Sequence, residues 1–163
     1  MTKLDKGGFN CIFLITMRDG FRMIARILYP VTVPKFYAVA SKVATMCFLH
    51  AKGLPVPQVY DYSPTPDNAA KTEYIFMEFI TGTKLSNIWM ELEGAEVALV
   101  VHQMVELEAQ IMLISFLAGR SLYYADDLQK AAGRMTGILM PLDDECFCIS
   151  PDVRLPMWYR RRS

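Results

Sequence analysis

A glycine-containing loop near the start of the chain and a basic residue on a later apolar stretch could together hold a phosphate group. The loop consists of Gly7, Gly8, Phe9 and Asn10, and the basic residue is Arg26. Glycines let backbone N–H groups approach an anion closely, while a cation on a neighbouring strand neutralises charge that the backbone cannot. Because this layout is typical of sites that bind nucleotide phosphates, we predict nucleotide binding here.

Both features also have an ordinary structural interpretation. A glycine pair before a strand is often no more than a hairpin loop, and a lone arginine on a strand is often a solvated side chain. The two interpretations make different demands on the fold. Nucleotide binding requires the loop and Arg26 to converge on one cleft, whereas the structural interpretation does not.

The segments that must position these residues form a predicted three-stranded antiparallel start. Residues 11–17 and 21–28 are apolar runs joined through Asp19 and Gly20, which is a strong hairpin signal. A short strand leads into the glycine loop and pairs with the first of these runs. The loop and Arg26 are therefore expected on adjacent strands of one sheet.

One helix and two further strands complete the predicted sheet. Apolar residues recur at three- and four-residue steps from 36 to 52, and Gly53 stops the pattern, so we predict an amphipathic helix beginning near Lys35. Residues 58–62 and 73–80 are predicted strands, separated by a polar loop. The predicted fold class is α+β, with a five-stranded antiparallel sheet and one helix.

Two helices are predicted after the sheet. Residues 85–92 are a predicted short helix. Residues 95–117 are a predicted long helix in which His102, Gln103, Glu106 and Gln110 share one face and the remaining circumference is almost wholly apolar. Because Glu106 and Glu108 lie within the long segment, where charge is expensive in a bilayer, we expect a buried core helix and no membrane span. Gly, Pro, Asp and Arg then follow without a period, so residues 126–163 are expected to be irregular.

Composition limits the size of the fold and the class of partner. A chain of 163 residues suits one domain with an appendage. Basic and acidic residues number 17 each, so no global field attracts nucleic acid or an acidic membrane. The start of the chain leaves no room for a secretory or transit peptide, and the 4 cysteines lack a disulfide framework. We expect an intracellular protein with reduced thiols, in which Cys146 and Cys148 are structural residues and not metal ligands.

Several short segments of the chain together resemble a known family. They are GGFN at 7–10, IARI at 24–27, SKVATM at 41–46, GLPVP at 53–57, YIFME at 74–78, VELE at 105–108 and SLYY at 121–124. As an ensemble, in register from about residue 4 to the C-terminus, they resemble the fungal branch of the aminoglycoside phosphotransferase family. Within that branch they are most similar to the group named altered inheritance of mitochondria protein nine.

The resemblance implies a protein-kinase-like fold and ATP-dependent phosphoryl transfer to a hydroxyl acceptor. It implies an N-lobe with its hinge at residues 1–82, the first helices of a C-lobe at 83–125, and an irregular part of a truncated C-lobe at 126–163. It also implies ATP as the cofactor and the mitochondrion as the compartment. By position, the residues that match nucleotide contacts are Gly7, Gly8, Phe9 and Asn10 in the loop over the phosphates, Arg26 at the third-strand basic position, and Glu78, Phe79 and Ile80 in the hinge whose backbone meets adenine.

Lys42 departs from the pattern of this family. It stands where the family's helix carries a glutamate that pairs with the third-strand cation. Helical spacing places residue 42 between Val39 and Met46 on the inward stripe, so it would face Arg26. Two such charges about 4 Å apart repel by about 4 kcal/mol at an effective dielectric constant near 20. We therefore expect Lys42 either to extend into solvent or to enclose an anion together with Arg26.

The residues that would transfer the phosphoryl group are not found in this sequence. Transfer requires a loop of the H-x-D-x-x-x-x-N type and an acidic metal ligand after it, and neither His50 nor His102 begins such a loop. We expect no catalytic residue here and no magnesium held by this chain alone.

Three interpretations of the function follow from the sequence. The first is a kinase-like phosphotransferase portion that retains part of an ATP site but is catalytically incomplete. The second is a non-catalytic, pseudokinase-like interaction module whose helix at 95–117 binds another protein. The third is a remnant that does not fold cooperatively. The acceptor substrate is not predicted by any of them.

Overall fold

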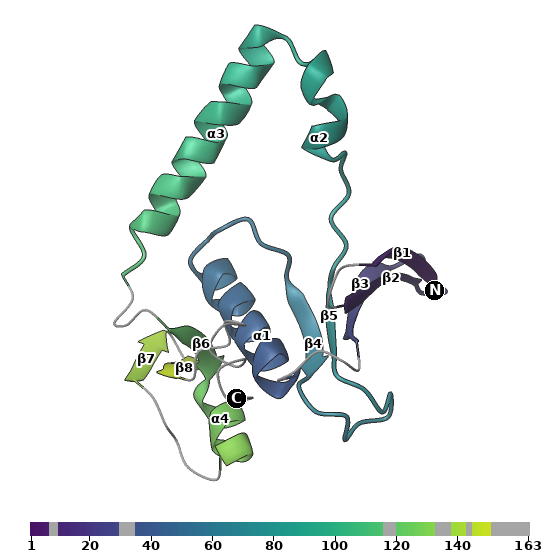
Figure 1. The fold of residues 1–163 in the computed structure, drawn as a ribbon, viewed down its shortest axis with the longest axis vertical. Helices are drawn as coiled ribbons and strands as arrows, with labels where there is room; N and C mark the ends of the chain where they lie inside the picture. The colour runs from purple at the N-terminus through teal and green to yellow at the C-terminus, as the bar shows by residue number, and fades with distance from the viewer. Residues whose placement is uncertain (7–9, 30–34, 116–119, 133–137, 143–144, 151–163) are drawn as a thin grey trace, which may run out of the picture. The chain divides into compact units, whose positions relative to one another are not determined.

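Strands and helices are both present, so the fold is α+β as predicted (Figure 1). The computed structural model describes residues 1–6, 10–29, 35–115, 120–132, 138–142 and 145–150. Its strands are β1 (Thr2–Lys6), β2 (Asn10–Thr16), β3 (Arg22–Leu28), β4 (Val59–Ser63), β5 (Tyr74–Glu78), β6 (Ser121–Tyr124), β7 (Ile138–Leu142) and β8 (Glu145–Ser150). Its helices are α1 (Lys35–Ala51), α2 (Leu85–Ile88), α3 (Gly94–Met112) and α4 (Ala125–Ala132), and the 3-10 turn η1 (Trp89–Glu91) follows α2.

The first five strands form one antiparallel sheet, which confirms the predicted sheet. Their order is β1-β2-β3-β5-β4, with β3 in the centre. The hairpin between β2 and β3 turns at Gly20, whose φ of 88° lies in the left-handed region that glycine adopts without strain. The Asp19 carboxylate accepts a hydrogen bond from the Phe21 backbone N–H at 3.0 Å, which closes the turn. The sequence signal for this hairpin is therefore reproduced in its geometry.

Helix α1 covers the face of the sheet that carries Arg26. Leu28 and Ile75, from β3 and β5, form a buried cluster with Val39 and Val43 of α1. Arg26 stands directly opposite Ile75 in the ladder and two residues before Leu28. Because opposite residues and alternate residues in a sheet share a face, Arg26 lies on the side that α1 covers.

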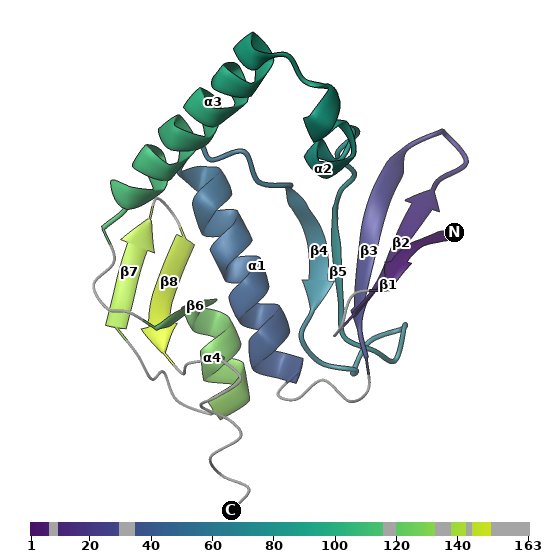
Figure 2. The ribbon, with the colours of Figure 1, turned by 45° about the horizontal axis from the view of Figure 1, so that its top comes forward.

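A second sheet packs against α1 and was not predicted. It is antiparallel, in the order β6-β8-β7, and Figure 2 shows α1 lying between it and strands β4 and β5. Tyr123 of β6, Leu128 of α4 and Cys148 of β8 are buried together with Ala40 of α1. Instead of the irregular segment predicted at 126–163, the described residues of that range form α4, β7 and β8. Short strands show little periodicity in sequence, and they become regular structure only by pairing with strands that are distant in the chain.

The chain divides into two compact units. One unit contains residues 1–79 and 117–163, and the other contains residues 80–116. The predicted boundaries lie after residues 82 and 125. The later segment joins the first unit because its β6 and β8 share a hydrophobic core with α1.

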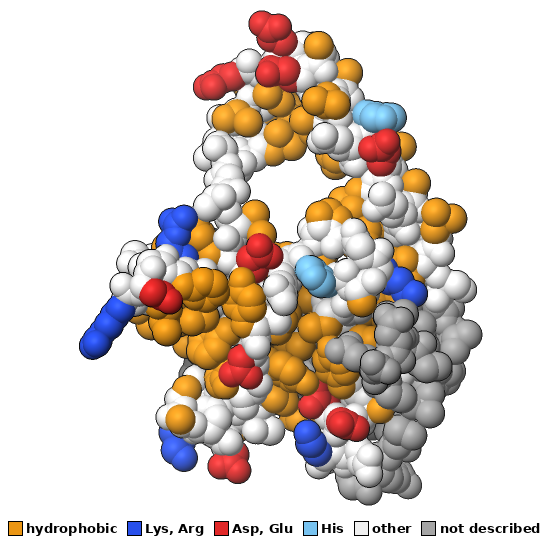
Figure 3. Space-filling view, turned by 180° about the vertical axis from the view of Figure 1, so that it is seen from behind, with side chains coloured by type: hydrophobic (Ala, Val, Ile, Leu, Met, Phe, Trp, Pro, Cys, Tyr) orange, Lys and Arg blue, Asp and Glu red, His pale blue; other side chains and the backbone are white. Residues whose placement is uncertain are grey.

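Helix α3 forms where the long helix was predicted, but it ends at Met112, earlier than predicted, and it is not a core helix. None of its 19 residues is buried, and Met104 and Val105 are 60% and 57% exposed. Figure 3 shows hydrophobic side chains at the surface in its upper part, where α2 and α3 lie. Apolar periodicity indicates a face suited to burial, but burial itself requires a covering surface, and no part of the described chain buries α3. No described helix combines the length and the apolar character needed to cross a bilayer.

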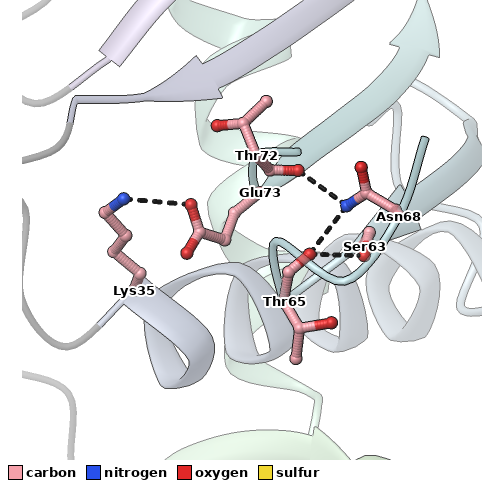
Figure 4. A network of polar contacts seen from close by, with 6 residues as sticks. All are labelled: Lys35, Ser63, Thr65, Asn68, Thr72 and Glu73. Carbon is pink, nitrogen blue, oxygen red and sulfur yellow. Dashed lines mark hydrogen bonds and ion pairs between the residues drawn. The ribbon is translucent and has the colours of Figure 1, made fainter. Parts of the chain in front are cut away.

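The start of α1 is tied to the sheet by a buried carboxylate (Figure 4). The Lys35 ammonium donates to the Glu73 carboxylate at 3.0 Å, and the Glu73 side chain is only 8% exposed. The loop before Glu73 is held by Asn68, whose side-chain amide donates to the carbonyl oxygens of Thr65 and Thr72, each at 2.7 Å. These contacts fix where α1 begins relative to β5.

A second buried carboxylate joins β4 to α4. The Tyr62 hydroxyl donates to the Asp127 carboxylate at 2.8 Å, and Asp127 is 7% exposed. Burial raises the pKa of Asp127 above its ordinary value, and the hydrogen bond from Tyr62 opposes part of that rise.

The raised pKa of Asp127 predicts a pH dependence of stability. As the pH rises from about 3.8 through the raised pKa, the folded state holds more protons than the unfolded state, so this residue contributes progressively less stability. Between pH 4 and pH 7 the wild type should therefore lose stability relative to Asp127→Asn, whose side-chain carbonyl can still accept the Tyr62 hydrogen bond. Urea unfolding at both pH values measures this loss. The exposed neighbour provides the control, since Asp126→Asn should show little such change, and parallel pH profiles for Asp127→Asn and the wild type would refute the prediction.

Candidate functional site

The predicted phosphate loop joins β1 to β2. Gly7, Gly8 and Phe9 lie outside the described residues. Asn10 begins β2 and is buried, with 8% exposed. It stands opposite Leu28 of β3, so it shares the α1-facing side of the sheet with Arg26. The structure therefore places two of the predicted site residues on one face of adjacent strands.

Arg26 and Lys42 form a pair of like charges on this face. Arg26 is half-buried on the central strand, and burial lowers the pKa of its guanidinium. Lys42, on α1, is exposed, yet partial loss of hydration and then the positive charge of Arg26 lower the pKa of its ammonium. The two cations thus lie within electrostatic reach of each other, as helical spacing predicts. The Lys42 side chain extends toward solvent, which was one of the two predicted outcomes.

No described carboxylate pairs with either of these cations. In the described ranges, the ion pairs join Lys35 to Glu73 and His102 to Glu106. The same ranges contain no group of acidic, cysteine and histidine side chains arranged to hold a metal ion. The site offers the Arg26 guanidinium and the buried amide of Asn10 on one sheet face, with the Lys42 ammonium on the helix that covers it, a donor set suited to an anion.

The predicted hinge begins where the sheet ends. Glu78 is the last residue of β5, its N–H donates to the Gln58 carbonyl at 2.8 Å, and its carboxylate accepts from the Gln58 N–H at 3.2 Å. The ladder between β3 and β5 ends with Glu78 opposite Met23, so Phe79 and Ile80 continue beyond it. The Arg22 guanidinium lies over the Phe79 ring at 4.7 Å, and Ile80 is the first residue of the second unit. The Glu78 side chain therefore secures the end of the sheet.

Lys42 is predicted from the sequence as a departure from the family pattern that either extends into solvent or encloses an anion with Arg26. The structure brings it into the site, because its charge acts on the same sheet face as Arg26. The helical spacing of Lys42 between Val39 and Met46 was the sequence feature that predicted this position. The contact between Glu78 and Gln58 had no such signal, because it depends on how β4 and β5 meet.

The relatives of this chain are fungal proteins. It is similar to altered inheritance of mitochondria protein 9. The identity is 29% over 89% of this chain for the protein of that name from Clavispora lusitaniae, and 31% over 79% for that from Candida albicans. A subtelomeric hrmA-associated cluster protein of Aspergillus fumigatus is 38% identical over 100% of the chain. No family model matches the chain.

The chain spans less than a third of the length of these relatives. It covers 31% of the Aspergillus protein, 25% of the Clavispora protein and 22% of the Candida protein. Similarity to the altered inheritance of mitochondria group, expected from the sequence, is confirmed, and those relatives are named mitochondrial. The names of these relatives describe no phosphotransferase activity.

Proposed function

We propose that this chain is the nucleotide-binding portion of a kinase-like phosphotransferase, with ATP phosphates held against Arg26. The observation that carries the proposal is the setting of Arg26. It is half-buried on the central strand, shares its face with Asn10 and lies within electrostatic reach of Lys42. Burial removes water from a guanidinium. Phosphate oxygens can replace the lost hydrogen bonds to water with charge-assisted ones. In the part of the chain that is described, no carboxylate fills that role.

The topology supports a kinase-like arrangement of the site. A sheet in the order β1-β2-β3-β5-β4, with one helix between β3 and β4, matches the N-lobe that the sequence resemblance implies. The glycine loop connects β1 to β2, and β2 is the strand that pairs with β3, which carries Arg26. The backbone N–H and the carboxylate of Glu78 are both engaged with Gln58, so within this unit the proposed adenine contact comes from the backbone of Phe79.

The reaction in this proposal is phosphoryl transfer from ATP to a hydroxyl. It requires a catalytic carboxylate and metal ligands, which we place outside the matched 31% of the Aspergillus relative. Within this chain, Arg26 would position the phosphates and offset their charge. The names of the relatives make the mitochondrion the proposed compartment.

Removing the Arg26 guanidinium tests the proposal. We expect the wild-type chain to bind a non-hydrolysable ATP analogue saturably, and Arg26→Ala to weaken that binding by at least about tenfold, the value of one charge-assisted contact. Isothermal titration calorimetry measures both affinities. Arg18→Ala is the matched control, since it removes the same charge from the exposed turn between β2 and β3. Equal losses in the two variants would reduce the effect to net charge and contradict the proposal.

The exposed helix α3 favours a second candidate, a non-catalytic interaction module. Its surface includes Leu99, Met104, Val105 and Ile111, each between 44% and 60% exposed, and none of its residues is buried. A run of exposed apolar residues of this kind suits docking by another protein. Failure of the wild-type chain to bind nucleotide, together with a defined oligomer in light scattering, would favour this candidate over the first.

A further inference from the structure

We propose that Arg26 and Lys42 form a two-cation clamp that binds the triphosphate of ATP without a divalent metal ion. The inference rests on the proposed function and goes beyond it, because it states that the ligand is ATP without a bound metal ion. A nucleotide site usually combines one strand cation with a metal ion, which together offset the phosphate charge. Here a second cation is built into the helix that covers the sheet.

The position of Lys42 is fixed by its neighbours on α1. Ser41 and Val43 on either side of it are buried, at 6% and 0% exposed. The Ser41 carbonyl accepts a hydrogen bond from the Thr45 hydroxyl at 2.7 Å, and the start of the helix is tied to β5 through Lys35. Residue 42 therefore lies on a part of α1 that packs on the sheet through Val39 and Val43, whereas its long, exposed side chain is free to turn toward a ligand.

The charge balance of the face favours a polyanion. A carboxylate at position 42 would pair with Arg26 and leave no net charge for the phosphates, so a metal ion would have to supply it. With lysine there, the two side chains carry the charge of one divalent cation. Their mutual repulsion, which contributes to the lowered pKa of Lys42, is relieved when a polyphosphate lies between them.

Exposure of Lys42 makes the clamp accessible from solution. Arg26 is half-buried and Lys42 is exposed, so one cation is positioned by the sheet and the other can close on the ligand. The buried amide of Asn10, on the same face as Arg26, adds a neutral donor. This combination suits phosphate oxygens that are not already coordinated to a metal.

The test compares ATP binding in excess EDTA with binding in excess Mg²⁺, by calorimetry on the whole chain. We expect the wild type to bind ATP in EDTA at least as tightly as in Mg²⁺, and inorganic tripolyphosphate to compete in EDTA. Lys42→Glu, which can pair with Arg26, should bind at least about tenfold more weakly in EDTA, a loss on the scale of one charged contact. Lys42→Gln, which removes the charge without adding an opposite one, should fall between the two.

Lys52→Gln is the matched control, because it makes the same substitution at another lysine. Lys52 directly follows α1, and its ammonium lies 5.7 Å from the Phe48 ring centroid. It should bind ATP as the wild type does. Wild-type binding that requires Mg²⁺ would overturn the clamp and leave the proposed nucleotide function intact. No binding in either buffer would overturn both. Thermal unfolding of each variant shows that the fold is retained.

Discussion

Replacing Phe147 by alanine is expected to lower the free energy of unfolding by about 3–5 kcal/mol, the usual cost of truncating a buried aromatic side chain. Phe147 lies on β8 and is 0% exposed. Its ring meets the Phe48 ring of α1 edge-to-face at 5.5 Å and stacks on the Tyr124 ring of β6 at 4.9 Å. Truncation therefore leaves a cavity and removes two aromatic contacts at once. Urea unfolding followed by circular dichroism measures the loss.

This prediction also tests whether the second sheet belongs to the same core as α1. Met104→Ala on α3 is the control, because Met104 is 60% exposed and its truncation should change stability by no more than about 0.5 kcal/mol. Phe147→Leu should cost less than Phe147→Ala because it keeps part of the volume. A loss below about 1 kcal/mol for Phe147→Ala would mean that β8 does not contribute to this core.

Replacing Lys35 by methionine is expected to cost about 2–3 kcal/mol of stability, because it leaves a buried carboxylate without its cation. The Glu73 side chain is 8% exposed and that of Lys35 is 26% exposed, so the pair is only partly screened by water. Methionine preserves the aliphatic length of lysine, which isolates the loss of charge from a loss of packing. Chemical denaturation at neutral pH measures the change.

A double variant separates the cost of the orphaned charge from the value of the pair. Lys35→Met combined with Glu73→Met removes both charges, and we expect it to recover most of the lost stability, since a buried pair replaced by apolar groups is often close to neutral. Lys52→Met removes a comparable charge outside any described ion pair and should have little effect. Costs that simply add in the double variant would contradict this account of Glu73.

The first sheet and α1 were predicted because their signals are local. Asp19 and Gly20 specify a tight turn through their own backbone preferences, and the apolar period of α1 together with Gly53 marks one helix and its end. The second sheet was missed because its strands are short and pair over long separations, as when Tyr124 meets Phe147. Nothing in either segment alone specifies that partner.

The residues of the candidate site and the opposition of Arg26 to Lys42 could be predicted from the sequence, but the positions of Asn10 and of the Glu78 side chain could not. Arg26 was identified from its type and place, and Lys42 from helical spacing. That Asn10 shares a face with Arg26 came from the register of β2 and β3. The engagement of the Glu78 carboxylate with Gln58 came from the meeting of β4 and β5. Each of these depends on hydrogen bonding between strands and not on one segment.

Turn chemistry and periodicity act within a few residues, so the hairpin, α1, the presence of α3 and the two opposed cations could all be worked out from the order of amino acids. Burial is a property of pairs of surfaces. Only the tertiary structure therefore shows that α3 is exposed and that the first unit includes β6, α4, β7 and β8. Both depend on whether segments far apart in sequence cover one another.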